Sequence, residues 1–269
     1  MARVAVLVPA YNAARVIGES IQSILNQTYR DLEVVVVDDA STDGTTDLVE
    51  HIVAADSRLR LLRNERNLGI ADNRNRALRD SESEFVAWQD ADDISMPRRL
   101  ERQVTYLDSH PEVGMVGGWL EFFGGRSPSV RRYAATDAEV RRTIFRYSPV
   151  AQPAAILRRA VLDRAGPYDS RSEPAEDLDM AFRLGHFTTF ANLQEVVLRY
   201  RETPDSTTSR RLRRMELETL RLRQIHARSG YASRPSDWAW NIAQAGSLLL
   251  LPAPARIAVF NLIRNHRAS

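Results

Sequence analysis

Two short clusters of acidic residues are the part of this chain best suited to chemistry. The first is Asp38-Asp39, and the second is Asp90-Ala91-Asp92-Asp93. Carboxylates grouped in this way repel one another, so a cation or several hydrogen-bond donors must hold them together. Aspartate oxygens are ligands that Mg²⁺ and Mn²⁺ prefer, and Mg²⁺ commonly takes one or two carboxylates together with substrate phosphates. The clusters therefore favour a divalent metal that carries a diphosphate group.

Each cluster can also be explained without a ligand. Asp39 or Ser41 could cap a following helix, and Asp93 could cap another or belong to a solvated acidic loop. A D-x-D pair alone favours that simpler interpretation. The first cluster comes directly after a short apolar segment, however, and the second follows another with only Gln89 between; this position favours a metal-binding role for Asp90 and Asp92. A carboxylate of the first cluster could then accept a hydrogen bond from a nucleobase or a ribose hydroxyl.

Two further segments contain residues that could bind a nucleotide. In Pro9-Ala10-Tyr11-Asn12, the tyrosine ring could stack on a base and the asparagine could form a hydrogen bond, although a turn with a helix cap at Asn12 is nearly as good an explanation. Arg74 could pair with a phosphate. A surface arginine without a specific role is the default interpretation, because all 37 Lys and Arg residues of this chain are arginine.

The pair Glu176-Asp177 stands where a helix is expected to begin, directly after Pro174-Ala175. A carboxylate there could act as a general base that removes a proton from an attacking hydroxyl group. It could equally complement the helix dipole and the free backbone N–H groups of the first turn. Spacing alone ranks the dipole interpretation first.

The elements that would position these residues follow from the apolar pattern. Short apolar runs predict strands, and apolar residues at helical spacing between them predict helices. The order β-α-β-α-β-α-β predicts an α/β protein with a mostly parallel sheet and right-handed crossovers. Ligands of such sheets bind beyond the carboxyl ends of the strands, where the acidic clusters lie. The expected strands are 4–8, 34–37, 59–62 and 85–88, with helices over 16–25, 48–53 and 71–78 between them.

The rest of the chain is expected to complete this domain and to add a helical extension. We predict a first half over 1–100, a second half of the same domain over 101–209, and a C-terminal helical extension over 210–269. Within these parts we expect a strand over 112–123, a helix that Asp137 caps and that runs to Arg146, an Arg-rich helix over 210–228, and an apolar tail interrupted by prolines.

Composition excludes several classes of protein. The 269 residues include no cysteine, so a disulfide or a thiolate zinc site is excluded. A formal net charge of +2 does not favour a nucleic-acid partner. The start lacks a secretory signal, and the run Leu248–Leu251 is far shorter than the roughly 20 residues of a membrane-spanning helix. We expect a cytoplasmic protein, with peripheral membrane contact through 210–269 as one option and a solvated helix with a packed tail as the other.

Taken in order, the motifs resemble those of the family 2 inverting glycosyltransferases, which have the GT-A fold: a Rossmann-like sheet flanked by helices. The resemblance covers roughly residues 3–209, and the ordered set is far more specific than any one piece. The segments that carry it are 8–13, 23–29, 37–45, 67–71, Arg74-Asn75, 90–93 and 176–179.

The resemblance implies a single in-line displacement of a nucleoside diphosphate by an acceptor hydroxyl, without a covalent intermediate. It implies a nucleotide-sugar donor, with uridine diphosphate sugars favoured, and a glycan, lipid-linked or small-molecule acceptor, as in cell-surface glycan or glycoconjugate synthesis. The implied cofactor is Mn²⁺ or Mg²⁺. The implied donor-binding residues are Pro9, Ala10, Tyr11, Asn12, Asp38, Asp39, Arg74, Asp90 and Ala91; Asp92 with Asp90 would hold the metal, and Asp177 would be the general base with Glu176 supporting it.

Two departures from the family pattern matter. Many relatives have a histidine in a Y-R-x-H-P pattern where this chain has Thr203, so Thr203, Glu202 or Asp205 would have to supply that contact or the chain does without it. The Q-x-x-R-W signature of processive synthases is missing, which favours addition of a single sugar. The loops 118–135 and 147–175 are expected to select the sugar and the acceptor.

Three alternatives remain open at this point. A polyprenyl-phosphate sugar synthase is a close relative that differs in its phosphate acceptor. A nucleotidyltransferase would normally have a Gly-rich basic loop near the first strand, which Pro9-Ala10-Tyr11-Asn12 is not. A non-catalytic sugar-nucleotide-binding protein would keep Asp39 but would not need Asp177.

Overall fold

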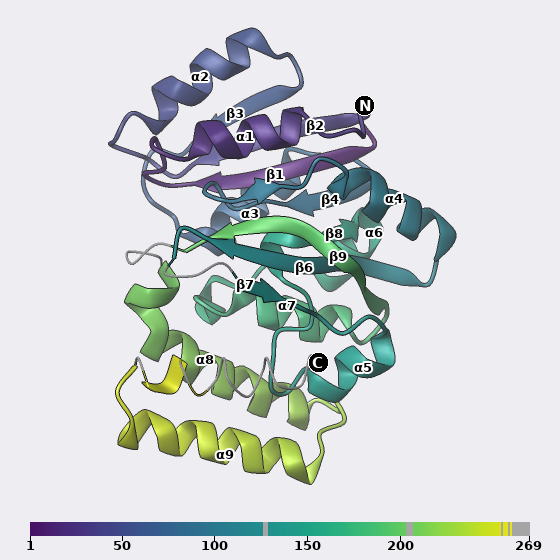
Figure 1. Cartoon of the computed structure of the whole chain (residues 1–269), viewed down its shortest axis with the longest axis vertical. Coiled ribbons are helices and arrows are strands. Elements are labelled where there is room, and N and C mark those ends of the chain that lie inside the picture. Colours follow the sequence, from purple (N-terminus) through teal and green to yellow (C-terminus); the bar gives the residue numbers. More distant parts are fainter. Residues whose placement is uncertain (126–128, 203–206, 254, 258, 260–269) are drawn as a thin grey trace.

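One sheet of nine strands runs through the computed structural model, which describes residues 1–269 except 126–128, 203–206, 254, 258 and 260–269 (Figure 1). The strand order is β3-β2-β1-β4-β8-β6-β9-β5, and β7 pairs with β6 beside this path. Helices cover both faces of the sheet, as expected for an α/β protein.

The first hundred residues form the parallel part of the sheet. The runs predicted as strands over 4–8, 34–37 and 85–88 are buried on both faces, which is why they read as continuous apolar segments rather than alternating ones. In the run 59–62 only Leu59 is buried. Helices α1, α2 and α4 pack on one face, and α3, α6 and α7 pack on the other. The strands are β1 (Val4–Ala10), β2 (Leu32–Asp38), β3 (Leu59–Arg63) and β4 (Phe85–Trp88), joined by α1 (Ile17–Leu25), α2 (Thr45–Ala55) and α3 (Ile70–Arg79).

The second part of the sheet is mixed. The long strands β6 (Val113–Phe123) and β9 (Thr189–Arg201) run parallel to each other, after α4 (Arg99–Ser109). The strands β5, β7 and β8 pair antiparallel with their neighbours and are absent from the predicted elements, because two or three residues give no readable pattern. They span β5 (Ile94–Ser95), β7 (Ser129–Arg131) and β8 (Ile156–Arg158).

The short helices of this part are α5 (Asp137–Thr143), α6 (Arg159–Ala165) and α7 (Glu176–Leu184). Asp137 does not cap α5, contrary to the expectation: Thr136 is the N-cap and forms a capping box with Glu139. The Asp137 carboxylate instead accepts a hydrogen bond from the backbone N–H of Phe190. The helix predicted to start near Glu176 is present as α7.

The chain ends in an antiparallel helical hairpin of α8 (Thr207–Arg228) and α9 (Pro235–Leu250), at the end of the molecule opposite α2 (Figure 1). As expected, proline interrupts the apolar tail, because α9 ends at Leu250, shortly before Pro252, and α8 begins three residues before the predicted start. His226 Nε2 lies 3.0 Å from Asp179 Oδ1, which ties α8 to α7. Within the described part of the chain, no helix is both long and apolar enough to cross a membrane.

Candidate active site

The predicted site residues gather at the carboxyl edge of the parallel strands. The register pairs Ala10 with Asp38, and Leu7 with Trp88, so the residues that follow β1, β2 and β4 all leave the sheet on the same side. The two described non-glycine residues with positive φ, Asn12 (φ 50°) and Ala40 (φ 60°), lie at this edge. Such conformations are concentrated at functional sites.

Asp39 holds the loop that leads into α3. Its Oδ1 accepts hydrogen bonds from the backbone N–H of Leu68 (2.8 Å) and from Asn64 Nδ2 (2.7 Å), and its Oδ2 accepts one from the N–H of Gly69 (3.0 Å). An ionised carboxylate offers about four acceptor positions, so about one is left for a ligand. Gly69 is required here, because its φ is +92° and a Cβ would lie 2.9 Å from the Glu173 carboxylate.

Asp38 is also buried at this edge. Its Oδ2 accepts a hydrogen bond from Thr46 Oγ1 (2.6 Å), while its Oδ1 has no hydrogen-bond partner among the described residues. Neither Asp39 nor Ser41 caps the following helix; the N-cap of α2 is Gly44. The first cluster is therefore engaged in building the strand edge and its loops.

Tyr11 and Asn12 differ in how open they are to a ligand. The Tyr11 side chain is 53% exposed, whereas Pro9 and Ala10 are buried in β1. Asn12 joins two loops: its backbone N–H donates to Ser41 Oγ and its Oδ1 accepts from the N–H of Thr42. Asn12 does not cap α1, whose N-cap is Val16. The open aromatic ring at the strand end leaves a face on which a base can stack.

Arg74 is buried, which rules out the interpretation of a surface arginine. It is 5% exposed, and its Nη1 donates to Glu176 Oε1 at 2.5 Å, across 102 residues of sequence. The guanidinium also lies over the rings of Trp88 (5.4 Å) and Tyr168 (5.5 Å). Burial raises the pKa of Glu176 to about 7, against the opposing attraction of Arg74.

Asp177 lies in the first turn of α7, close to this ion pair. Its Oδ1 accepts a hydrogen bond from the N–H of Leu178 (2.8 Å), as the dipole interpretation expects. Burial raises the pKa of Asp177, and the charge of Arg74 opposes that shift. The negative charge of Asp177 raises the pKa of Asp90, and the charges of both carboxylates raise the pKa of Arg74. The acid of α7 and the acidic loop after β4 therefore share one cation.

The carboxylates of Asp90 and Asp92 are half-buried, and neither accepts a hydrogen bond from another residue in the described part of the chain. Burial raises the pKa of Asp90 to about 6, and repulsion from Asp92 adds to this shift. The described residues contain no group of three or more His, Asp or Glu that could hold a metal alone. Two carboxylates fit Mg²⁺ or Mn²⁺ that completes its coordination with phosphate oxygens.

Two buried or half-buried arginines that were not singled out from the sequence fix the acidic loop. Arg99, 1% exposed, donates to the carbonyl oxygen of Trp88 and to Gln89 Oε1, and burial lowers its pKa to about 9. Arg201 at the end of β9 donates from its backbone N–H to Asp93 Oδ1 (2.9 Å) and from Nε to the carbonyl oxygen of Asp92 (2.9 Å). Asp93 is thus a buried anchor of the loop and not a helix cap.

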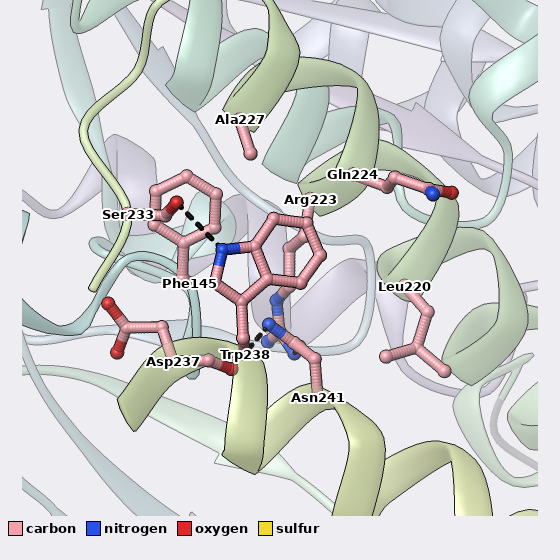
Figure 2. Close-up of a pocket in the computed structure, with 9 residues that line it drawn as sticks. All are labelled: Phe145, Leu220, Arg223, Gln224, Ala227, Ser233, Asp237, Trp238 and Asn241. Carbon is pink, nitrogen blue, oxygen red and sulfur yellow. Dashed lines mark hydrogen bonds between the residues drawn. The ribbon is translucent and has the colours of Figure 1, made fainter. Parts of the chain in front are cut away.

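Thr203, where this chain departs from the family pattern, and Asp205 both lie outside the described residues. Glu202 is exposed, and its backbone N–H donates to the carbonyl oxygen of Phe123 at 2.8 Å. A separate cavity of about 20 Å³ lies between α8 and α9, with Trp238 and Arg223 among its lining residues (Figure 2). It has room for about one water molecule and is not a donor site.

Comparison with known proteins identifies the class to which this fold and site belong. The model of the family described as "Glycosyl transferase family 2" matches residues 5–166, and the chain belongs to this family. An uncharacterized glycosyltransferase of Haemophilus influenzae is 31% identical over 217 residues, which cover 77% of this chain and 67% of that protein. The Escherichia coli protein WfgD, named as a UDP-Glc:alpha-D-GlcNAc-diphosphoundecaprenol beta-1,3-glucosyltransferase, is 41% identical over 104 residues, or 39% of this chain and 40% of that one.

Solved structures confirm the GT-A fold. Residues 1–349 of S. aureus TarS, in complex with UDP-GlcNAc, superpose with a TM-score of 0.72 at 24% identity, covering 87% of this chain and 69% of that one. The chain covers only 39% of the longer TarS structure. The mannosyltransferase PcManGT from Pyrobaculum calidifontis, in complex with GDP-Man and Mn²⁺, gives a TM-score of 0.66 at 23% identity and covers 99% and 83% of the two chains.

Proposed function

We propose that this glycosyltransferase moves a single sugar, with inversion, from a nucleoside diphosphate sugar to a hydroxyl acceptor in glycan or glycoconjugate synthesis. The observation that carries the proposal is the shared electrostatic cluster in which Arg74 lies among Glu176, Asp177 and Asp90. It joins a candidate base on α7 to a candidate metal site after β4. A uridine diphosphate donor is favoured by the ligand of TarS and the name of WfgD.

Each part of the cluster has a distinct task in this proposal. Tyr11 stacks on the base, and Asp39 accepts a hydrogen bond from the base with its remaining acceptor position. Asp90 contacts the donor's ribose or sugar. Asp177 removes the proton of the acceptor hydroxyl as that oxygen attacks the anomeric carbon. Glu176 holds Arg74 in place, so that its charge keeps Asp177 deprotonated.

Asp92, with Asp90, would hold the divalent metal, which would neutralise the charge that develops on the leaving diphosphate. The Mn²⁺ in the PcManGT complex supports a metal of this kind. Under this proposal, residues 1–100 bind the donor and residues 101–209 supply the base and bind the acceptor. The helices after residue 209 form an extension outside the catalytic half.

The test of the base is Asp177→Asn, which keeps the size of the side chain and removes its charge. We expect turnover to fall by roughly 10²–10⁴-fold, the usual contribution of general-base catalysis, while donor affinity stays unchanged. The matched control is Asp163→Asn on α6. The Asp163 side chain is 61% exposed and pairs only with Arg159 among the ion pairs described. A fully active Asp177→Asn enzyme would place the base elsewhere.

The pH profile of the unmodified enzyme gives a second measurement of the same residue. The base must be deprotonated to act, and burial raises the pKa of Asp177. The value of kcat/KM should therefore fall with decreasing pH along a limb that lies above the pKa of an ordinary aspartate, about 3.9. A limb at or below pH ~4 would contradict the assignment.

The metal assignment is tested by donor binding, which does not require turnover. A bound donor raises the melting temperature by mass action, so a thermal-shift screen of nucleoside diphosphates and their sugars, with Mn²⁺ or with EDTA, reports binding directly. We expect Asp92→Asn to abolish the Mn²⁺-dependent part of the shift. If the unmodified enzyme and Asp92→Asn gave identical shifts, both with and without Mn²⁺, a metal at Asp92 would be refuted.

Product analysis separates the remaining alternatives. The proposed reaction releases nucleoside diphosphate and requires a sugar hydroxyl acceptor. Transfer to a polyprenyl phosphate in place of a saccharide would identify a polyprenyl-phosphate sugar synthase. Release of inorganic diphosphate would identify a nucleotidyltransferase, and donor binding without transfer to any hydroxyl or phosphate acceptor would leave a binding protein.

A further inference from the structure

The outward face of α9 is apolar along its length. Ile242, Leu249 and Leu250 recur at i, i+7 and i+8, so they lie on one face of the helix. They are 70%, 83% and 81% exposed. No charged residue occurs in the sequence from 238 to 255. A helix face in contact with water normally carries charged or polar side chains, so this face is suited to an apolar environment.

The segment that contains this face is strongly basic. Residues 207–269 contain eleven arginines and three acidic residues, a formal net charge of +8 in a chain whose total is +2. Among the described side chains, Arg213 and Arg214 on α8 are exposed, and so are Arg228 and Arg234 on either side of the turn into α9. The complementary partner is therefore anionic as well as apolar.

The ion pair between Arg256 and Glu216 (2.7 Å) shows how these charges sit relative to the apolar face. It places the chain just after α9 beside the first half of α8, where Arg213 and Arg214 lie. The turn that carries Arg228 and Arg234 is at the opposite end of α9. Positive charge therefore flanks both ends of the apolar face.

We propose that α9 docks this enzyme on the surface of an anionic lipid bilayer. A helix of 16 residues is about 24 Å long, too short to cross a hydrocarbon core of about 30 Å. A helix with one apolar face and flanking arginines instead lies in the plane of the interface, with its apolar side chains among the upper acyl chains.

The geometry of the hairpin also points to the class of acceptor, and this step rests on the proposed function. Arg201, which holds the acidic loop, ends β9, and α8 begins six residues later at Thr207. The C-terminal end of α9, with Leu249 and Leu250, lies at the end of the hairpin that leads back toward the candidate site (Figure 1). Docking through this end brings the site to the membrane surface. The acceptor is then a lipid-linked saccharide, as the name of WfgD indicates for that relative.

Vesicle co-sedimentation of the full chain tests the docking. We expect the protein to pellet with vesicles of phosphatidylcholine that contain one quarter phosphatidylglycerol, and much less with phosphatidylcholine alone. Raising the salt concentration should weaken binding, because it screens the arginines. The double variant Leu249→Glu/Leu250→Glu should lower the affinity for the anionic vesicles by about tenfold or more. Both side chains are exposed, so the folded state should survive, which the circular dichroism spectrum and melting temperature check.

Two controls make the result specific. Val130→Glu alters another exposed apolar residue, 46% exposed on β7, and should leave vesicle binding unchanged. Arg213→Gln/Arg214→Gln should weaken binding to anionic vesicles only. Failure of the unmodified chain to pellet with anionic vesicles would overturn the proposal. So would a dimer in sedimentation velocity that Leu249→Glu/Leu250→Glu dissociates, because the face would then be an interface between two copies.

Donor binding separates this inference from the proposed function. If the thermal shift with UDP and Mn²⁺ is present while vesicle binding is absent, only the docking surface is wrong. If the chain binds vesicles but no nucleoside diphosphate, the proposed function is wrong and the docking surface stands.

The acceptor step is tested by comparing transfer to a vesicle-embedded lipid-linked saccharide with transfer to the same saccharide without lipid. We expect the unmodified enzyme to prefer the embedded acceptor. If Leu249→Glu/Leu250→Glu showed the same preference, the acceptor step would be overturned.

Discussion

The C-terminal hairpin buries charged side chains within it, whereas the parallel strands bury apolar ones. In β1 and β2, Leu7 and Val34–Val37 are 0% exposed, and the charged residues stand at the strand ends. In the hairpin, Arg223 and Asp237 are 5% and 3% exposed, whereas Leu250 is 81% exposed. Arginine and aspartate are rarely buried unless they are paired. The contrast teaches that the sheet is organised by its core, while α9 is attached in a way that leaves its apolar face outward.

Directional polar contacts help to attach the hairpin, beside aromatic packing of Trp240 on Tyr147 (ring centroids 5.8 Å apart) and of His226 on Phe182 (4.5 Å). Arg146 Nε lies 2.7 Å from Asp237 Oδ1, and Arg223 Nη1 donates to the amide oxygens of Asn241 and Gln244 at 2.9 Å each. Charge-assisted hydrogen bonds add geometric specificity, so they help to fix the orientation of α9. Ile242, Leu249 and Leu250 remain exposed on its outer face, which is the feature that the docking inference uses.

The largest effect that can sharpen this comparison comes from two buried arginines with different partners. Arg74→Met leaves Glu176 buried without its cation, and removing one partner of a buried ion pair costs about 3–5 kcal/mol. We expect this loss at pH 8, and a smaller loss at pH 6, because burial raises the pKa of Glu176 to about 7 and the acid is then protonated.

Arg223→Met is the matched variant in the hairpin. It leaves two neutral amide oxygens without a donor, so we expect a loss of only about 1–2 kcal/mol with little dependence on pH. Urea unfolding of both variants at pH 6 and pH 8 gives the four values. Equal losses, or a pH dependence in Arg223→Met, would contradict the distinction between the two regions.

A second pair of variants applies one substitution to both regions. Leu7→Ala removes a side chain that is 0% exposed in the sheet, and such changes cost about 2–5 kcal/mol. Leu250→Ala removes an exposed side chain and should change the free energy of unfolding in water by no more than about 0.5 kcal/mol. A large loss for Leu250→Ala in urea unfolding without lipid would show that another part of the chain covers α9, and the comparison would fail.

The sequence predicted the regions in which local pattern decides structure. A β-branched run such as Val34–Val37, with acids directly after it, can hardly be anything other than a buried strand of an α/β sheet. The apolar run 85–88, with acids shortly after it, predicts another buried strand, and the parallel register then places both acid clusters at one edge. The family assignment and the GT-A fold are confirmed, while the roles of individual site residues remain predictions.

What the sequence could not show depends on contacts between distant residues. Arg74 meets Glu176 across 102 residues, and nothing local distinguishes it from the many exposed arginines of this chain. Arg99 and Arg201 are hidden for the same reason. A local signal was available for α5, since Thr136 and Glu139 form a capping box, and Asp137 was the wrong choice.

A third test concerns the acid that joins the two regions. Asp179 lies two residues after Asp177 on α7 but faces the hairpin, where His226 lies 3.0 Å from Oδ1 and Arg183 lies 2.8 Å from Oδ2. Burial opposes the charge of this carboxyl, but the contacts with His226 and Arg183 hold the pKa of Asp179 below its usual value. A lowered pKa in the folded state stabilises the protein above the unfolded pKa, about 3.9, and this stabilisation is lost as the pH falls through the folded value.

Asp179→Asn should therefore lower the free energy of unfolding by about 1–3 kcal/mol at pH 7, the usual value for hydrogen bonds to a charged group. The difference in the free energy of unfolding between the two proteins should shrink as the pH falls below about 4, because the Asp179 carboxyl then becomes protonated and is neutral, like the asparagine. Urea unfolding of both proteins at neutral and acid pH measures the two differences. If the loss were the same at both, shape rather than charge would join α7 to α8, and the hairpin would be attached by packing, as the strands of the sheet are.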